Sequence, residues 1–133
     1  QGKAHRIDLP NQVFSRIHVD DIVSAVQASF DGPPGVYNLA DDSPCSQNQV
    51  IEAACDIAGL DYPPLLSLEA AGLSQEGRAF YSENRRVSNG KAKRLLGWTP
   101  RYADFATGLR VLSAMTSPAI ANAPPPAAIP VQR

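Results

Sequence analysis

Cysteine, net charge and long apolar runs are all scarce in this 133-residue chain. Its two cysteines, Cys45 and Cys55, form no Cys-x-x-Cys motif and have no histidine at ligand spacing, which predicts reduced thiols rather than a disulfide framework. No apolar run approaches the roughly 20 residues that span a bilayer, and the first residues lack the pattern of a secretory signal. We therefore expect a cytoplasmic protein.

The formal net charge is only -1. Such a balance produces no overall field that attracts nucleic acid or an anionic membrane, so we expect neither as a partner and any basic site must be local. With 44% hydrophobic and 19% charged residues, the chain has the composition of one globular domain. A domain of this length can bury a core without metal ions or disulfides.

Apolar periodicity predicts alternating strands and helices in the first part of the chain. The predicted elements are a connecting loop at 1–12, a β-rich stretch at 13–19, a helix at about 22–30, a loop at 31–35 and a short covered strand at 36–40. Asp20 or Asp21 is expected to cap the helix, because a carboxylate accepts hydrogen bonds from the free amides of a first turn.

In the second part, Ser46 and Gln49 have the spacing of a capping box, and Gly59 and Gly97 are typical helix stops. The predicted elements are a helix at 46–58, a strand at 65–68, an irregular helical stretch at 69–83, a short helix at 91–96 capped by Ser88 or Asn89, and a last helix at 103–115. Two apolar helix faces are expected to be buried: Val50, Ala54, Ile57 and Ala58 on the first of these helices, and Phe105, Leu109 and Leu112 on the last. The Ala- and Pro-rich residues 116–133 predict a flexible tail.

Three segments occur in an informative order: Arg16-Ile17-His18-Val19-Asp20-Asp21, Val36-Tyr37-Asn38-Leu39-Ala40-Asp41, and the stretch from Lys91 to Pro100 that contains Leu96-Gly97-Trp98. Together they resemble the C-terminal half of an extended short-chain dehydrogenase/reductase, the NAD(P)-dependent epimerase/dehydratase family, over roughly residues 5–112. The resemblance implies an α/β fold. Residues 1–42 would be the last part of a Rossmann-like NAD(P)-binding domain, and residues 43–115 a small α+β substrate-binding lobe.

The chemical motifs of that family are not in this sequence. The chain contains no Gly-x-x-Gly-x-x-Gly, the loop that holds a dinucleotide pyrophosphate. The resembled family uses a tyrosine with a lysine four residues later as its acid-base group. None of the four tyrosines in this chain is followed by lysine at that spacing. We therefore assign no catalytic and no cofactor-binding residue. NAD or NADP is expected for a longer parent protein, an epimerase, dehydratase or reductase, and no cofactor for this chain alone.

Two groups of residues have both a functional and a structural interpretation. His18, Asp20 and Asp21 include types that bind metals, but three such groups at one strand end rarely converge, and capping explains them; we assign no metal site. Cys45, near a helix start, would have a lowered thiol pKa if the helix dipole dominated, but no histidine lies nearby in sequence to activate it.

A basic run holds seven of the twelve lysines and arginines, with Glu83 as its one acid. Its members are Arg78, Arg85, Arg86, Lys91, Lys93, Arg94 and Arg101. One interpretation is a solvated face. The other is an anion site in which Arg85 and Arg86 pair with a substrate phosphate or carboxylate and Tyr81, with Phe80, provides a flat wall. The hypothesis of a nucleic-acid site is weaker, because the whole chain is not basic.

Phe14 is a departure from the resembled family. Members that act on nucleotide-linked sugars often have an arginine four residues before the histidine of the first segment, and here that position is Phe14, with Arg16 two residues later. A nucleotide sugar is therefore in doubt, and an atypical or reductase-like relative is the alternative. The competing hypothesis for the chain is a non-catalytic module that binds a ligand or a protein, since an unpaired strand edge would also favour a homodimer.

Overall fold

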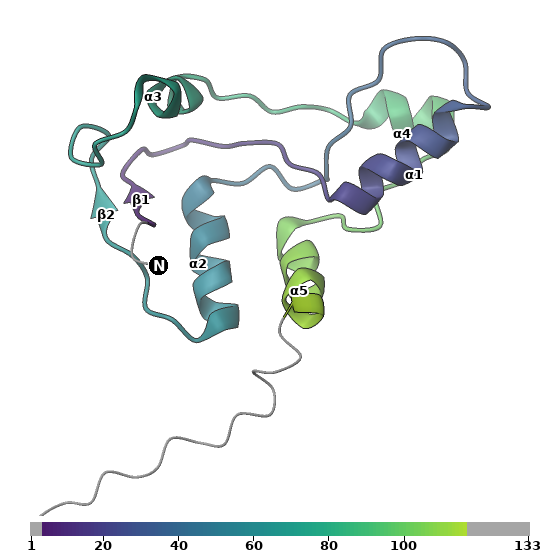
Figure 1. Cartoon of the computed structure of the whole chain (residues 1–133). Helices are drawn as coiled ribbons and strands as arrows, with labels where there is room; N and C mark the ends of the chain where they lie inside the picture. Colours follow the sequence, from purple (N-terminus) through teal and green to yellow (C-terminus); the bar gives the residue numbers. More distant parts are fainter. Residues whose placement is uncertain (1–3, 117–133) are drawn as a thin grey trace, which may run out of the picture.

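The computed structural model describes residues 4–116 as a mixed α/β chain (Figure 1). In chain order the elements are β1 (Arg6–Ile7), α1 (Val19–Ser29), α2 (Gln47–Ala58), β2 (Leu65–Leu66), α3 (Gln75–Ser82), α4 (Gly90–Leu96) and α5 (Phe105–Thr116). Within these residues the sheet is the parallel pair β1–β2, with Arg6 opposite Leu65 and Ile7 opposite Leu66. The predicted tail lies outside the described residues, apart from the backbone of Thr116.

Helices α1 and α4 pack against each other around Ala25, Ala92 and Trp98, which are 1%, 0% and 4% exposed. Two alanines at the contact allow the helix axes to approach closely. The indole Nε1 of Trp98 donates a hydrogen bond to the Ser24 hydroxyl at 2.9 Å, so the one polar atom of the buried ring is satisfied. This contact fixes the chain as it leaves α4 after Gly97, whose φ of 61° ends the helix as predicted.

Asp21 holds this end of the molecule to the start of α1. Its carboxylate is 1% exposed and accepts hydrogen bonds from the backbone amides of Arg101 at 2.7 Å and Tyr102 at 3.0 Å. The prediction that Asp20 or Asp21 caps α1 is therefore wrong. The cap is His18, whose Nδ1 accepts from the Asp20 amide at 3.2 Å, because the Asp21 carboxylate is used by amides 80 residues further along the chain.

The capping box predicted for the next helix is confirmed. The Ser46 hydroxyl accepts from the Gln49 amide at 3.1 Å, the Gln49 side chain accepts from the Ser46 amide at 2.8 Å, and Gly59 ends α2 with a φ of 65°. The buried stripe predicted on this helix is wrong, since Ala54, Ile57 and Ala58 are exposed. Among the described elements, α2 packs against α5 and β1 only, so much of its apolar face stays exposed.

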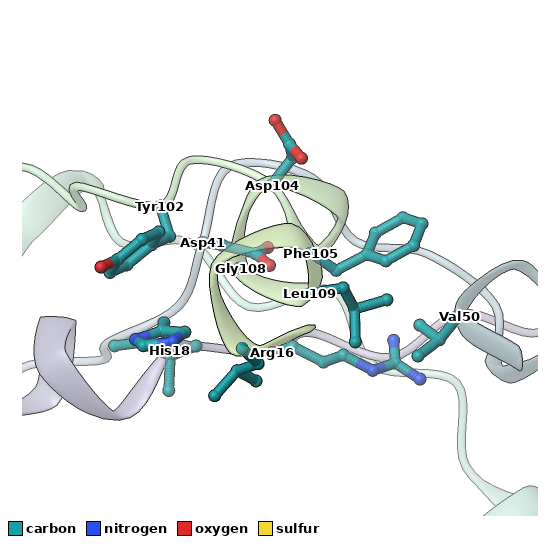
Figure 2. Close-up of a pocket in the computed structure, with 11 residues that line it drawn as sticks. Arg16, His18, Asp41, Val50, Tyr102, Asp104, Phe105, Gly108 and Leu109 are labelled. Atoms are coloured by element: carbon teal, nitrogen blue, oxygen red, sulfur yellow. The ribbon is translucent and has the colours of Figure 1, made fainter. Parts of the chain in front are cut away.

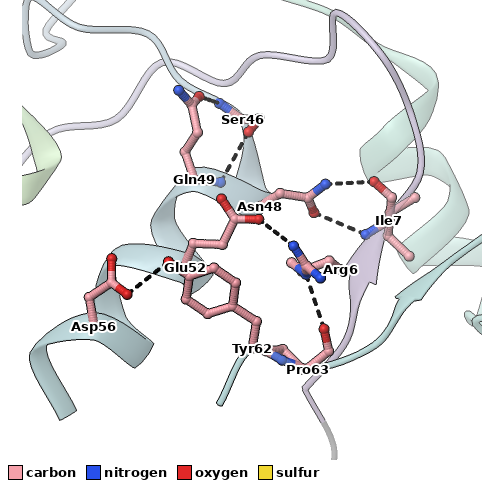
Figure 3. Close-up of polar contacts among 9 residues, drawn as sticks. All are labelled: Arg6, Ile7, Ser46, Asn48, Gln49, Glu52, Asp56, Tyr62 and Pro63. Carbon is pink, nitrogen blue, oxygen red and sulfur yellow. Dashed lines mark hydrogen bonds and ion pairs between the residues drawn. The ribbon is translucent and has the colours of Figure 1, made fainter. Parts of the chain in front are cut away.

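Strand β1 is stabilised by a side chain on α2 as well as by β2 (Figure 3). Asn48 accepts from the Ile7 amide at 2.9 Å and donates to the Ile7 carbonyl at 2.8 Å, the two bonds that a further strand would make. Arg6 bonds Glu52 at 2.6 Å and the Pro63 carbonyl at 3.0 Å. The prediction of a loop throughout residues 1–12 is therefore wrong.

The two strands predicted at 13–19 and 36–40 do not form within the described residues. The first segment makes isolated bridges at Phe14, to Cys45 and to Arg85, and the second is extended without a ladder. A strand needs a neighbour to accept its backbone hydrogen bonds, and neither segment has a regular one in this part of the chain. Residues 13–18 instead connect β1 with α1 (Figure 1), and residues 36–40 lie against the α1–α4 core, where Tyr37 and Leu39 pack on it.

Helix α1 exposes an apolar stripe. Val19, Val23, Val26 and Phe30 are 61%, 53%, 47% and 79% exposed, and their spacing of four, three and four residues places them along one side of the helix. None of the helices in residues 4–116 is long and apolar enough to cross a membrane. An apolar stripe of this kind is typical of a surface that packs against another protein layer.

Candidate functional site

Three extended segments meet at Phe14 and build the candidate site. The Phe14 amide donates to the Cys45 carbonyl at 2.9 Å, and the Cys45 amide donates back at 3.2 Å. On the other side, the Asn84 side chain accepts from the Val13 amide at 3.2 Å and donates to the Asn11 carbonyl at 2.8 Å. These bonds place the end of α3 beside Phe14, although about 70 residues separate the two in sequence.

An aromatic cluster forms where α3 reaches this junction. The rings of Phe14 and Phe80 stack with centroids 4.2 Å apart and an interplanar angle of 16°. Tyr81 meets both rings edge-on, at 5.9 Å from Phe14 and 5.4 Å from Phe80. Phe80 remains 53% exposed, so the cluster presents a flat apolar surface to solvent.

A pocket of about 170 Å³ opens over this surface, lined by Phe14, Ala79, Phe80, Glu83 and Arg85. The guanidinium of Arg85 lies 2.7 Å from the Glu83 carboxylate, and the two side chains are 75% and 57% exposed. An ion pair this exposed adds little stability, so Arg85 can exchange Glu83 for another anion at small cost. The pocket thus combines an aromatic wall with one available guanidinium.

The predicted site residues are only partly brought together. Arg85 lines the pocket, and Tyr81 supports its wall through the Phe14 and Phe80 rings. Arg86 is exposed but does not line the pocket. The sequence alone does not predict that Phe14 lines the pocket. The one signal at this position is that an aromatic residue stands where the resembled family often has arginine.

Burial raises the pKa of the Tyr81 hydroxyl, and the positive charge of Arg16 offsets part of this effect. Tyr81 therefore stays protonated near neutral pH and is suited to donate a hydrogen bond rather than to act as a base. The Arg16 guanidinium lies 5.5 Å from the Phe14 ring centroid and donates to the Cys45 carbonyl at 2.9 Å and to Gln47 at 2.8 Å. Arg16 thus links the Phe14 ring to the Cys45 segment and to the start of α2.

The rest of the basic run is spread over other contacts. Lys91 donates to the Val36 carbonyl at 2.9 Å, and Lys93 pairs with the Asp42 carboxylate at 2.6 Å. Both lysines thus hold α4 to the connection that precedes α2, which agrees with a structural interpretation of these two members. The anion-site hypothesis is left with the part of the run near Arg85.

The Cys45 thiol and a metal group at His18, Asp20 and Asp21 are the two other candidates from the sequence. Cys45 is 4% exposed, and burial raises the pKa of its thiol, so the helix start does not activate it as a nucleophile. Cys45 and Cys55 are both free thiols, as expected. The described residues contain no group of three or more His, Cys, Asp or Glu side chains that could hold a metal ion.

No family model matches the chain, and no curated protein matches it. Solved structures do match it, among them the following two. One is a functionally unknown conserved protein from Silicibacter pomeroyi, with 43% sequence identity and a TM-score of 0.82 over 86% of this chain and 42% of that one. The other is RMD from Pseudomonas aeruginosa complexed with NADPH, with 18% identity and a TM-score of 0.62 over 86% of this chain and 36% of that one.

These two likenesses have different weight. At 18% identity, the similarity to the NADPH-complexed protein indicates a shared fold in this region and nothing more. The 43% identity of the other structure indicates a much closer relative, but one described as functionally unknown. The chain spans less than half of the length of both of these proteins.

Proposed function

We propose that this chain is the C-terminal, substrate-binding part of a longer NAD(P)-dependent epimerase, dehydratase or reductase with a Rossmann-like cofactor domain. The observation that carries the proposal is the pocket over Phe14 and Phe80, in which an aromatic wall and the Arg85 guanidinium come from segments far apart in the chain. The similarity of fold to a protein complexed with NADPH supports the nicotinamide part of the proposal. So do the three sequence segments that resemble the family.

In this proposal the pocket binds a small substrate with an anionic group. Arg85 pairs with the phosphate or carboxylate and releases Glu83, because a charge-assisted fork to a bound anion replaces a solvent-exposed pair. Tyr81 supports the wall and Arg86 adds positive charge from outside the pocket. The hydride and proton chemistry would belong to a cofactor domain and to an acid-base tyrosine that this sequence does not contain.

The proposal is tested in a longer protein that includes this chain. Replacing Arg85 and Arg86 with Ala should raise KM more than it lowers kcat, because these side chains would hold the substrate rather than the reacting atoms. Lys91→Ala, at an exposed basic residue engaged with a backbone carbonyl, is the matched control and should leave KM unchanged. Unchanged kinetics in the double variant would exclude the pocket as the substrate site.

A second candidate function is a non-catalytic binding module, and the exposed stripe of Val19, Val23, Val26 and Phe30 favours it. Such a stripe can bind a partner protein or a second copy of the chain. A fluorescence titration of the 133-residue chain with NADH tests whether this chain binds the cofactor by itself. Saturable binding by the chain alone would contradict our placement of the cofactor site in another domain.

A further inference from the structure

A second cavity, of about 130 Å³, lies between the Arg16–His18 segment and α5 (Figure 2). It shares no lining residue with the pocket over Phe14 and Phe80. In the view of Figure 2, His18 lies at one end of the cavity and Val50 at the other, with Asp41 and Leu109 between them. A mostly apolar cavity with a few polar groups is the usual form of a small-molecule site.

His18 supplies an unused hydrogen-bond donor at this cavity. Its side chain is 10% exposed, and its Nδ1 accepts from the Asp20 amide at 3.2 Å. An acceptor at Nδ1 places the proton of the neutral ring on Nε2. This Nε2 is buried and has no hydrogen-bond partner within residues 4–116, an arrangement that costs free energy unless a ligand supplies an acceptor.

The His18 ring is held in this position by its neighbours. Its centroid lies 4.0 Å from that of Tyr102, and on α5 a Cβ added at Gly108 would lie 3.2 Å from the His18 Cδ2. Glycine at this point of the helix therefore leaves room for the ring. The imidazole cannot turn far to find another partner, because the Tyr102 ring and the α5 backbone at Gly108 both lie close to it.

The charges around the cavity favour an uncharged ligand. Arg16 is its one arginine, and that guanidinium already bonds the Cys45 carbonyl and Gln47. Asp41 and Asp104 line the same cavity and would repel an anion. Asp41 is 5% exposed, and burial raises its pKa against the opposing hydrogen bond from Ser43 and the charge of Arg16.

We propose that this cavity binds a small uncharged molecule with an apolar body and one hydroxyl or carbonyl oxygen, which accepts a hydrogen bond from His18 Nε2. A hydroxyl would in addition be able to donate to the Asp41 carboxylate. The size agrees with this class, since a protein cavity of about 150 Å³ holds benzene. The apolar body would lie against Val50 and Leu109.

The test uses phenol, benzene and benzoate as probes of the 133-residue chain, followed by amide chemical shifts in NMR titrations. Phenol should shift the Gly108 and Leu109 amides saturably and bind about three- to tenfold more tightly than benzene, the range that one hydrogen bond contributes. Benzoate should bind more weakly than phenol. His18→Phe should remove the preference for phenol over benzene.

Because His18 also caps α1, a second variant protects the test from a folding defect. Val50→Phe fills the far end of the cavity without touching His18 and should weaken phenol binding at least tenfold, whereas Val23→Phe on the exposed face of α1 should leave it unchanged. Absence of saturable shifts at Gly108, or equal affinities for phenol and benzene in the unaltered chain, would overturn the proposal. Undiminished phenol binding by Val50→Phe would do the same.

Discussion

Replacing Asp21 with Ala should destabilise the chain strongly, because its carboxylate joins two distant parts of the fold. The side chain is 1% exposed and accepts from the amides of Arg101 and Tyr102. Alanine leaves both amides without this partner, and a buried unpaired amide costs about 1 to 3 kcal/mol. Tyr102 is 6% exposed and should bear the larger cost, so we expect a total loss of about 3 kcal/mol.

The assay is urea unfolding followed by far-UV circular dichroism. Asp21→Asn keeps one carbonyl acceptor and should lose about half as much stability as Asp21→Ala. Asp61→Ala, at an exposed position in the connection from α2 to β2, is the matched control and should change the free energy of unfolding by less than about 0.5 kcal/mol. If Asp21→Ala unfolds at the same urea concentration as Asp61→Ala, the account of this carboxylate is wrong.

Three further predictions concern the caps, charges and thiols. Ser46→Ala should cost about 1 kcal/mol in urea unfolding, since it removes the side-chain cap of α2. Lys93 and Asn89 hold the pKa of Asp42 below its usual range, so the stability from this group is present above about pH 4 and is lost as the pH falls through the lower folded value; Lys93→Met should flatten that part of the acid unfolding curve. Cys45 should react with a thiol reagent at pH 8 more slowly than Cys55, because Cys45 is buried and its pKa is raised, and equal rates would contradict this.

Local signals in the sequence predict several helix ends correctly. The capping box at Ser46 and the left-handed stops at Gly59 and Gly97 depend only on residues within a few positions, so their spacing predicts them. Strand β1 was missed because its partners, Leu65–Leu66 and Asn48, lie more than 40 residues away. A strand of two residues is too short to show an alternating apolar pattern, so its pairing over that distance cannot be predicted from the sequence.

The candidate site shows the same division. Arg85 and Tyr81 were selected from the sequence because a cluster of arginines beside aromatic residues is a local pattern. The contribution of Phe14 depends on a junction of three segments and could not be predicted from spacing. The position of Asp21 predicts a cap, but the amides that its carboxylate binds come from residues 101 and 102, which local spacing cannot show.

The central claim is that this chain is the substrate-binding part of a longer NAD(P)-dependent enzyme, and the coding sequence upstream of Gln1 tests it most directly. We predict that the open reading frame continues upstream of Gln1. Read from its N-terminal end, it should encode a Gly-x-x-Gly-x-x-Gly loop after a strand and then a Tyr-x-x-x-Lys pair. A stop codon followed by a start codon immediately before Gln1 would contradict the claim and favour the binding-module function.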